Sequence, residues 1–189
     1  ERGFRIGANR EMKVDKKAAR QEKRSNLSKP ISLAEAERFA TAFNYPAKVG
    51  LVCYGGNNNN IATRFKKTNP TVTLFGADEA YLELNGFSIV WGRNFSRPEV
   101  QSAVNVCLLG HDVATKLFGD EVSAAIQKDV RINDVFYRVV GVLKARGSTF
   151  GFSRDNITII GYKSLVRSFP SVSFTIGVKA PEVSRAATM

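Results

Sequence analysis

Residues 130–143 have the sequence Val-Arg-Ile-Asn-Asp-Val-Phe-Tyr-Arg-Val-Val-Gly-Val-Leu. Val130–Ile132 and Phe136–Leu143 are rich in β-branched and aromatic residues, which favour strands. Asn133 and Asp134 lie between the two runs, and a two-residue polar connection is typical of an antiparallel hairpin. The stretch therefore predicts a hairpin whose second strand is long and largely apolar.

Short helices and isolated apolar strands surround this hairpin. The clearest helix signal is in Leu33–Phe43, where Ser32 is expected to be the N-cap and Glu35 to complete a capping box. Further strands are predicted at residues 48–54, 61–66, 71–75, 88–91, 104–109, 157–160 and 172–178, and further helices at 80–84, 112–118 and 162–169. This mixture indicates an α+β fold rather than a doubly wound one.

Three local features carry specific expectations. The loop at residues 55–60 contains two glycines followed by four asparagines, so the strands before and after it are predicted to form a meander. Arg97–Ser102 is expected to be a polar turn. Asp112 is expected to cap the helix at Val113–Phe118, because a carboxylate at a helix start can accept backbone N–H bonds.

The formal charge is +11 over 189 residues, and residues 1–30 hold ten Lys/Arg against four Asp/Glu. A basic arm of this kind can bind nucleic acid or an anionic membrane surface. The alternative is a solvated segment beside the folded body. No run of about 18 apolar residues occurs, and the chain does not begin with Met. We therefore expect either a soluble protein or, preferably, a soluble piece of a membrane protein.

No catalytic, cofactor-binding or metal site is predicted, and the domain is not expected to be an enzyme. The sequence lacks GxSxG, GxGxxG, Walker A and HExxH motifs, and a loop of glycines and asparagines without a following Lys-Ser/Thr is not a P-loop. His111 is the single histidine, and it is expected in a turn between a strand and a helix rather than as a general base. Carboxylate pairs such as Asp78-Glu79 are expected to be ordinary surface residues at a helix start.

Two further features leave alternatives open. Cys53 and Cys107 lie in apolar strand-like stretches and are expected to be buried, although a disulfide between them is not excluded. Phe150 and Phe152 lie in a Gly- and Ser-rich loop. Exposed aromatic residues there would form a partner-contact loop for a protein or an apolar ligand. The alternative is that both rings tuck under the loop into the core.

The middle of the chain resembles the periplasmic core domain of MacB/FtsX-like ABC transporter permeases. Blocks occur in the order found in that family and span about half of the chain: residues 72–78, 81–87, 92–95, 105–110, 113–120, 130–133, 137–143 and 155–160. Any one block is weak evidence for the family, whereas the ordered series of blocks is strong evidence.

The resemblance implies an α+β fold in which a porter-like α/β subdomain is interrupted by a small inserted α/β subdomain. The implied boundaries are a membrane-proximal basic arm at 1–30, the porter-like subdomain at 31–76 and 155–189, and the insertion at 77–154. The arm would then be a stalk beside the membrane rather than a nucleic-acid reader.

The implied function is that of the extracytoplasmic part of a permease in the cell inner membrane, on the periplasmic side. It would couple cytoplasmic ATP hydrolysis to the handling of cargo or of a partner. The partners are then the rest of the permease with its ATPase, a second copy in a homodimer, and a periplasmic adaptor or cargo protein. No cofactor and no nucleic acid are implied.

Two other function classes compete with this one. A stand-alone basic nucleic-acid-binding domain would explain the isoelectric point of about 9.9, and it predicts basic residues gathered on one folded face. A small hydrolase or transferase built around His111 is the other, and the sequence offers it almost no support.

Overall fold

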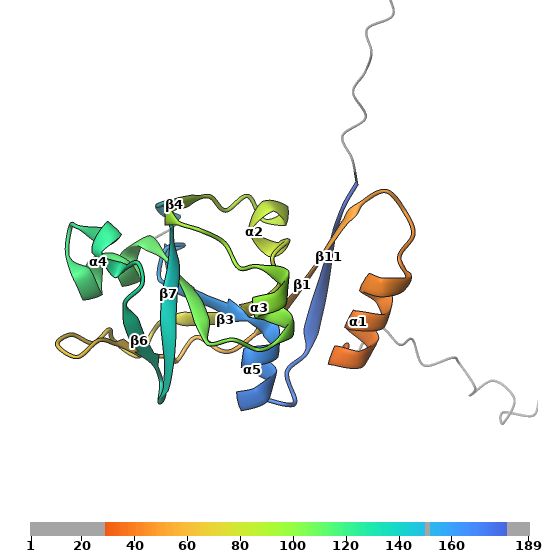
Figure 1. Ribbon diagram of the computed structural model, residues 1–189, viewed down its shortest axis with the longest axis horizontal. Helices are drawn as coiled ribbons and strands as arrows, with labels where there is room; N and C mark the ends of the chain where they lie inside the picture. Colours follow the sequence, from red (N-terminus) through yellow and green to blue (C-terminus); the bar gives the residue numbers. More distant parts are fainter. Residues whose placement is uncertain (1–28, 150–151, 181–189) are drawn as a thin grey trace, which may run out of the picture.

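The computed structural model describes residues 29–149 and 152–180 (Figure 1). The helices are α1 (Leu33–Ala42), α2 (Tyr81–Leu84), α3 (Arg97–Gln101), α4 (His111–Phe118), the 3₁₀ helix η3 (Val122–Ala125) and α5 (Tyr162–Ser168). The strands are β1 (Lys48–Tyr54), β2 (Ile61–Ala62), β3 (Thr73–Ala77), β4 (Ile89–Gly92), β5 (Val106–Leu109), β6 (Asp129–Ile132), β7 (Val135–Leu143), β8 (Ser148–Thr149), β9 (Phe152–Ser153), β10 (Ile157–Gly161) and β11 (Phe174–Lys179).

Nine of the strands in the described residues form one mixed sheet. Its order is β11-β1-β3-β10-β5-β7-β6-β2, with β4 paired to the C-terminal end of β7. Strand β10 lies in the middle, parallel to β3 and antiparallel to β5, and all five of its residues are buried. The remaining pair, β8 and β9, forms a separate small hairpin. The fold is therefore α+β with a mixed sheet, as predicted.

Helices cover both faces of the sheet. Gly76 of β3 is paired with Cys53 of β1, and helix α5 packs on the face of the sheet toward which these two residues point. A Cβ added at Gly76 would lie 2.8 Å from Leu165 Cβ. Helix α2 packs on the opposite face, because a Cβ at Gly50 would lie 2.3 Å from Leu84 Cδ1. Gly50 and Cys53 are three residues apart in one strand, and side chains at odd spacing point to opposite faces. Because residue 50 is glycine, α2 can pack directly against the backbone of β1.

The two strongest sequence signals are confirmed. Strands β6 and β7 pair in register around Asn133 and Asp134, and Asn133 adopts a positive φ of 52°, which asparagine tolerates in tight turns. Helix α1 begins with the predicted capping box: the Ser32 side chain accepts from the backbone N–H of Glu35, whose carboxylate accepts from the backbone N–H of Ser32.

Three local predictions are wrong. Strands β1, β2 and β3 are not a meander, because β2 pairs with β6 at the far edge, and Asn59 and Val72 bridge the chain on either side of it. Residues 97–101 form helix α3 rather than a turn, capped by Ser96 and Glu99 in a second capping box. Helix α4 begins after Gly110 without a side-chain cap, and the Asp112 carboxylate instead accepts a hydrogen bond from Ser153.

The division into a porter-like subdomain and an insertion stays a proposal. Strands β11, β1, β3 and β10 come from the two outer segments and are neighbours in the sheet. Strands β5, β7 and β6 come from the middle segment and are also neighbours. Strand β2 is the exception, since it belongs to the first segment but pairs with β6. Residues 1–28 of the basic arm lie outside the described residues.

Gly110 and Gly161 provide a matched test of packing. Both are extended N-cap residues, of α4 and α5 respectively. A Cβ at Gly110 would lie 2.2 Å from the backbone oxygen of Asp155, whereas a Cβ at Gly161 meets nothing closer than 3.5 Å. We predict that Gly110→Ala lowers the free energy of unfolding by about 1–3 kcal/mol, measured with urea. Gly161→Ala should change it by less than about 0.5 kcal/mol. Equal losses in both variants would contradict this packing.

Thr158, the second residue of β10, is fully buried, and its Oγ1 has no hydrogen-bond partner among the described residues. A buried hydroxyl without a partner lowers stability. We predict that Thr158→Val, which keeps the shape of the side chain, raises the free energy of unfolding by about 1 kcal/mol. Thr158→Ser is the control, because it keeps the hydroxyl and should not stabilise. A valine variant less stable than the native chain would refute the prediction.

Candidate functional site

A polar cleft of about 560 Å³ separates α1 from α3 and α5. Its floor includes Val49 and Leu51 of β1, and charged side chains line its rim. Helix α1 has one fully buried residue, Ala36, so it is only lightly attached to the sheet. Figure 1 shows α1 at one end of the molecule, beside the edge strand β11. The attachment of α1 across the cleft therefore depends on polar contacts.

Four side chains make that attachment. The Tyr162 hydroxyl at the start of α5 donates to Glu37 Oε1 of α1 (3.0 Å) and accepts from Gln101 Nε2 of α3 (3.0 Å). Lys163 Nζ lies 3.1 Å from the same Glu37 oxygen. Burial, together with the neighbouring Glu37 carboxylate, raises the pKa of Tyr162 despite the hydrogen bond from Gln101, so the phenol stays protonated and can donate. Glu37 thus links α1 to α5 across the cleft.

Asp78 forms a second polar junction on the rim. One carboxylate oxygen accepts from the backbone N–H of Leu51 in β1 (2.8 Å), and the other accepts from the backbone N–H groups of Ala80 and Tyr81 at the start of α2 (3.1 Å each). Burial raises the pKa of Asp78 to about 6 against the opposing effect of these hydrogen bonds. The expectation of an ordinary surface carboxylate is wrong here, since Asp78 joins strand to helix.

A third carboxylate, which unlike Glu37 and Asp78 is buried, shapes the loop that carries the predicted partner-contact residues. Asp155 accepts from the backbone N–H groups of Arg146 (2.8 and 3.0 Å) and Gly147 (2.8 Å), and it is 5% exposed. These bonds fix the chain just before the β8–β9 hairpin. Phe150 itself lies outside the described residues, and the side chain of Phe152, in β9, is also outside them. Their role as a contact loop stays a prediction.

The remaining residues singled out in the sequence are placed as follows. Cys53 and Cys107 are both free and buried, which confirms the structural interpretation, and burial raises the pKa of the Cys53 thiol to about 12. His111 is the first residue of α4, with Nδ1 3.5 Å from the Thr115 hydroxyl. Within residues 29–149 and 152–180, no three His, Cys, Asp or Glu side chains are grouped as a metal site requires.

The polar groups of the cleft hold elements of the fold together. Its carboxylates accept hydrogen bonds from backbone, phenol and ammonium donors, and these contacts join four elements of the fold. In the part of the chain that the structure describes, no helix has the length and apolar character needed to cross a membrane. The fold and the polar contacts describe a mixed α+β domain, and comparison with known proteins assigns its family.

The chain belongs to the family of MacB-like periplasmic core domains, whose sequence model matches residues 6–189. The resemblance found in the sequence is thus confirmed. This assignment places the chain with components of ABC transporter permeases and favours that hypothesis over a nucleic-acid-binding domain or a hydrolase.

Two curated relatives are similar to parts of the chain. The macrolide export ATP-binding/permease protein MacB of Chlorobaculum tepidum is 34% identical over 92 residues, which are 49% of this chain and 14% of the relative. The pyoverdine export ATP-binding/permease protein PvdT of Pseudomonas syringae pv. tomato is 32% identical over 117 residues, or 61% and 18% of the two chains. The matched region is therefore less than a fifth of each relative.

Solved structures share the fold. The periplasmic region of MacB from Actinobacillus actinomycetemcomitans superposes with a TM-score of 0.66 and 18% identity, covering 82% of this chain and 67% of that one. The extracellular domain of the ABC-type transporter YknZ from Gram-positive bacteria gives a TM-score of 0.61 at 19% identity, with coverages of 79% and 73%. At these identities the likeness concerns the fold alone.

The junction at Tyr162 can be tested by a double-mutant cycle. Tyr162→Phe removes the hydroxyl and should lower the free energy of unfolding by about 1–2 kcal/mol, because Gln101 and Glu37 both lose a partner. In combination with Glu37→Ala, the two losses should be non-additive by at least about 0.5 kcal/mol. Lys163→Ala is the control and should cost at most about 1 kcal/mol, since the pair is partly exposed. Strict additivity would show that the Tyr162–Glu37 bond carries no stability.

Proposed function

We propose that this domain is the extracytoplasmic part of an ABC transporter permease and that it couples ATP hydrolysis in the cytoplasm to the handling of cargo or a partner outside the membrane. The family assignment supports the transporter context. The names of the relatives, ATP-binding/permease proteins for export, support a link to ATP hydrolysis. The domain would act at the inner membrane, on its periplasmic side.

The observation that carries the proposal is the position of the two ends of the described chain. Ile31, which precedes α1, forms a bridge with Phe174 at the start of β11, and the described chain ends one residue beyond β11. The six residues of β11 separate the two points by about 17 Å at the usual rise of a strand. Both ends therefore lie along one edge strand, as a domain inserted between two membrane segments requires.

Movement applied at this edge would reach the rest of the domain by two routes. Strand β11 is paired with β1 over six residues, so a displacement of the edge passes into the sheet. Helix α1 is held to α5 and α3 through Glu37, Tyr162 and Gln101, which form the second route. Packed elements transmit such shifts because they resist continuous deformation.

The partners follow from the same proposal. The permease would function as a homodimer with the ATPase on the cytoplasmic side, and a periplasmic adaptor or cargo protein would contact the domain. The loop with Phe150 and Phe152 is one proposed contact. The segmental division at residues 77–154 would allow the inserted part to carry such contacts while the outer part is attached to the membrane. No catalysis by the domain itself is required.

A distance measurement in the intact, reconstituted permease tests the proposal. One spin label is placed at Lys116, an exposed position on α4, after the buried Cys53 and Cys107 are replaced by Ala. A homodimer should give one label-to-label distance by pulsed EPR. That distance should differ between the nucleotide-free and the vanadate-trapped states if ATP hydrolysis moves the domain.

Two outcomes would contradict the proposal. The absence of any label-to-label distance would exclude the homodimer, and identical distance distributions in both nucleotide states would exclude coupling to this domain. A label at Lys128, which is exposed in the turn before β6, provides a second measurement. The label-to-label distance at Lys128 should change together with the one at Lys116. ATPase activity measured in parallel confirms that the labelled permease is active.

A further inference from the structure

Phe65 is the most exposed large apolar side chain of the described residues. It is 89% exposed, whereas the next, Phe136, is 66% exposed. Phe65 lies in the turn between β2 and the bridge at Lys67, at the far edge of the sheet. One exposed ring is not unusual by itself, so the case for a contact depends on how the turn holds Phe65 and on the charges beside it.

The turn that carries Phe65 is rigid, although it lies on the surface. The Thr63 hydroxyl accepts from the backbone N–H groups of Phe65 (3.3 Å) and Lys66 (3.0 Å) and donates to the Lys66 carbonyl (3.3 Å). The Thr63 backbone N–H donates to the same carbonyl (2.8 Å). Four hydrogen bonds therefore fix four residues in one conformation. A backbone that is already ordered loses little entropy when the turn is bound.

The base of the turn is anchored in the sheet. The buried Thr68 hydroxyl accepts from the backbone N–H of Ile61 (3.0 Å), and the Thr68 N–H donates to the Ile61 carbonyl (2.9 Å). Ala62 pairs with Arg131 of β6. The turn is thus an extension of the β6–β7 hairpin rather than a separate loop.

The ring is surrounded by positive charge. Arg64, Lys66 and Lys67 are exposed and flank Phe65, and Arg131 is exposed on the neighbouring strand. None of the four forms an ion pair with another described residue, although five such pairs occur elsewhere in that part of the chain. Unpaired charges around an exposed ring favour a partner that carries the opposite charge. We call residues 63–67 the basic-aromatic turn.

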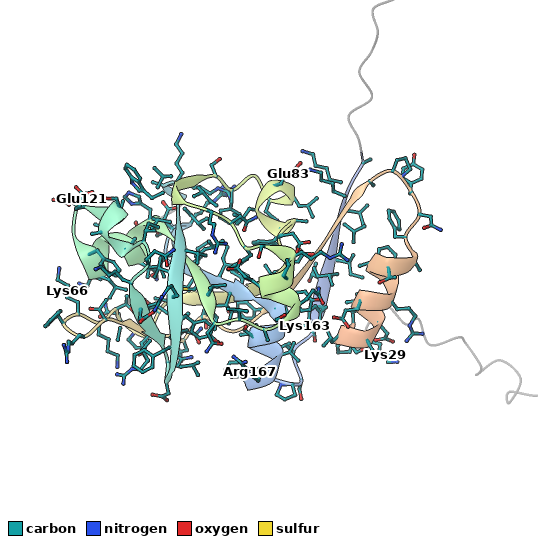
Figure 2. The ribbon with its side chains drawn as sticks, viewed as in Figure 1. Lys29, Lys66, Glu83, Glu121, Lys163 and Arg167 are labelled. Atoms are coloured by element: carbon teal, nitrogen blue, oxygen red, sulfur yellow. The ribbon has the colours of Figure 1, made fainter. Side chains whose placement is uncertain are left out.

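The basic-aromatic turn lies far from both ends of the described chain. Figure 2 shows Lys66 and Lys29 at opposite ends of the long axis of the molecule, and β11 lies on the same side as Lys29. If the ends are attached to a membrane, as the proposed function states, the turn points away from that membrane. Contact with the same bilayer is then unfavourable, which leaves a protein as the better fit.

We infer that the basic-aromatic turn is a docking element for an acidic protein surface. Phe65 would enter an apolar pocket, and carboxylates around that pocket would pair with Arg64, Lys66 and Lys67. The inference rests on the proposed function for the direction in which the turn points. The rigid turn, the exposure of Phe65 and the unpaired charges are independent of it.

Photo-crosslinking in the intact permease tests this inference. The photoreactive residue p-benzoylphenylalanine replaces Phe65 in the full-length protein, in the cells that naturally produce it. The control carries the same residue at Tyr45, which is 65% exposed and lies in the connection between α1 and β1, at the other end of the molecule. We expect one protein adduct from position 65 and none from position 45, with acidic residues in the cross-linked segment of the partner. The adduct is identified by mass spectrometry.

The identified protein is then purified, and its affinity for the intact permease is measured. Phe65→Ala should weaken binding by about tenfold or more, as expected for an aromatic anchor. Lys66→Glu should weaken binding as well. The affinity of the unmodified permease for the partner should fall as the salt concentration is raised. Tyr45→Ala should leave the affinity unchanged. The melting temperature should be the same in all three variants, because each changed side chain is exposed.

Several results would overturn the inference. These are adducts only with lipid or nucleic acid, no adduct, the same adduct from both positions, or an affinity insensitive to Phe65→Ala and to salt. The proposed function is tested separately. The label-to-label distance at Lys116 is measured in both nucleotide states of the Phe65→Ala permease. A preserved distance change with lost docking would reject the docking element alone.

Discussion

The pairing of β10 with two neighbours in opposite senses is the constraint on which the rest of this domain depends. Strand β10 is parallel to β3 and antiparallel to β5, so it joins the strands of the outer segments to those of the middle segment. Its five residues are buried on both faces, and the backbone groups between them must be paired because no water reaches them. A fully buried strand of this kind makes one core out of two sets of strands.

That constraint produces a domain with two unlike ends. At one end lie β11 and α1, where the polar contacts of Glu37 add to the apolar contact made by Ala36. At the other end the β6–β7 hairpin carries β2 and the basic-aromatic turn. Because the sheet is continuous between the ends, a shift at one end has a mechanical path to the other. This arrangement suits a module that transmits movement in a transporter, as we propose.

Local sequence signals predicted several helices and strands well. They failed for elements whose position depends on contacts with residues far away in the sequence. The β6–β7 hairpin and the α1 capping box were predictable, since each depends on residues within a few positions of one another. Helix α3 was also signalled by Ser96 and Glu99, but its five residues give too little periodicity to distinguish it from a turn. The position of β2 was not predictable, because it is set by pairing with a strand 70 residues later in the sequence.

Local composition and the ordered series of motifs were enough to predict the α+β class, the family and the burial of both cysteines. The polar sites, in contrast, exist only in the folded chain. Tyr162 and Glu37 are 125 residues apart, and Asp78 and Leu51 are 27 apart, so no spacing rule relates them. Likewise, Phe65 differs from buried phenylalanines only in what surrounds it. Burial and hydrogen-bond partners are properties of the folded neighbourhood, and the chain's own pattern does not specify them.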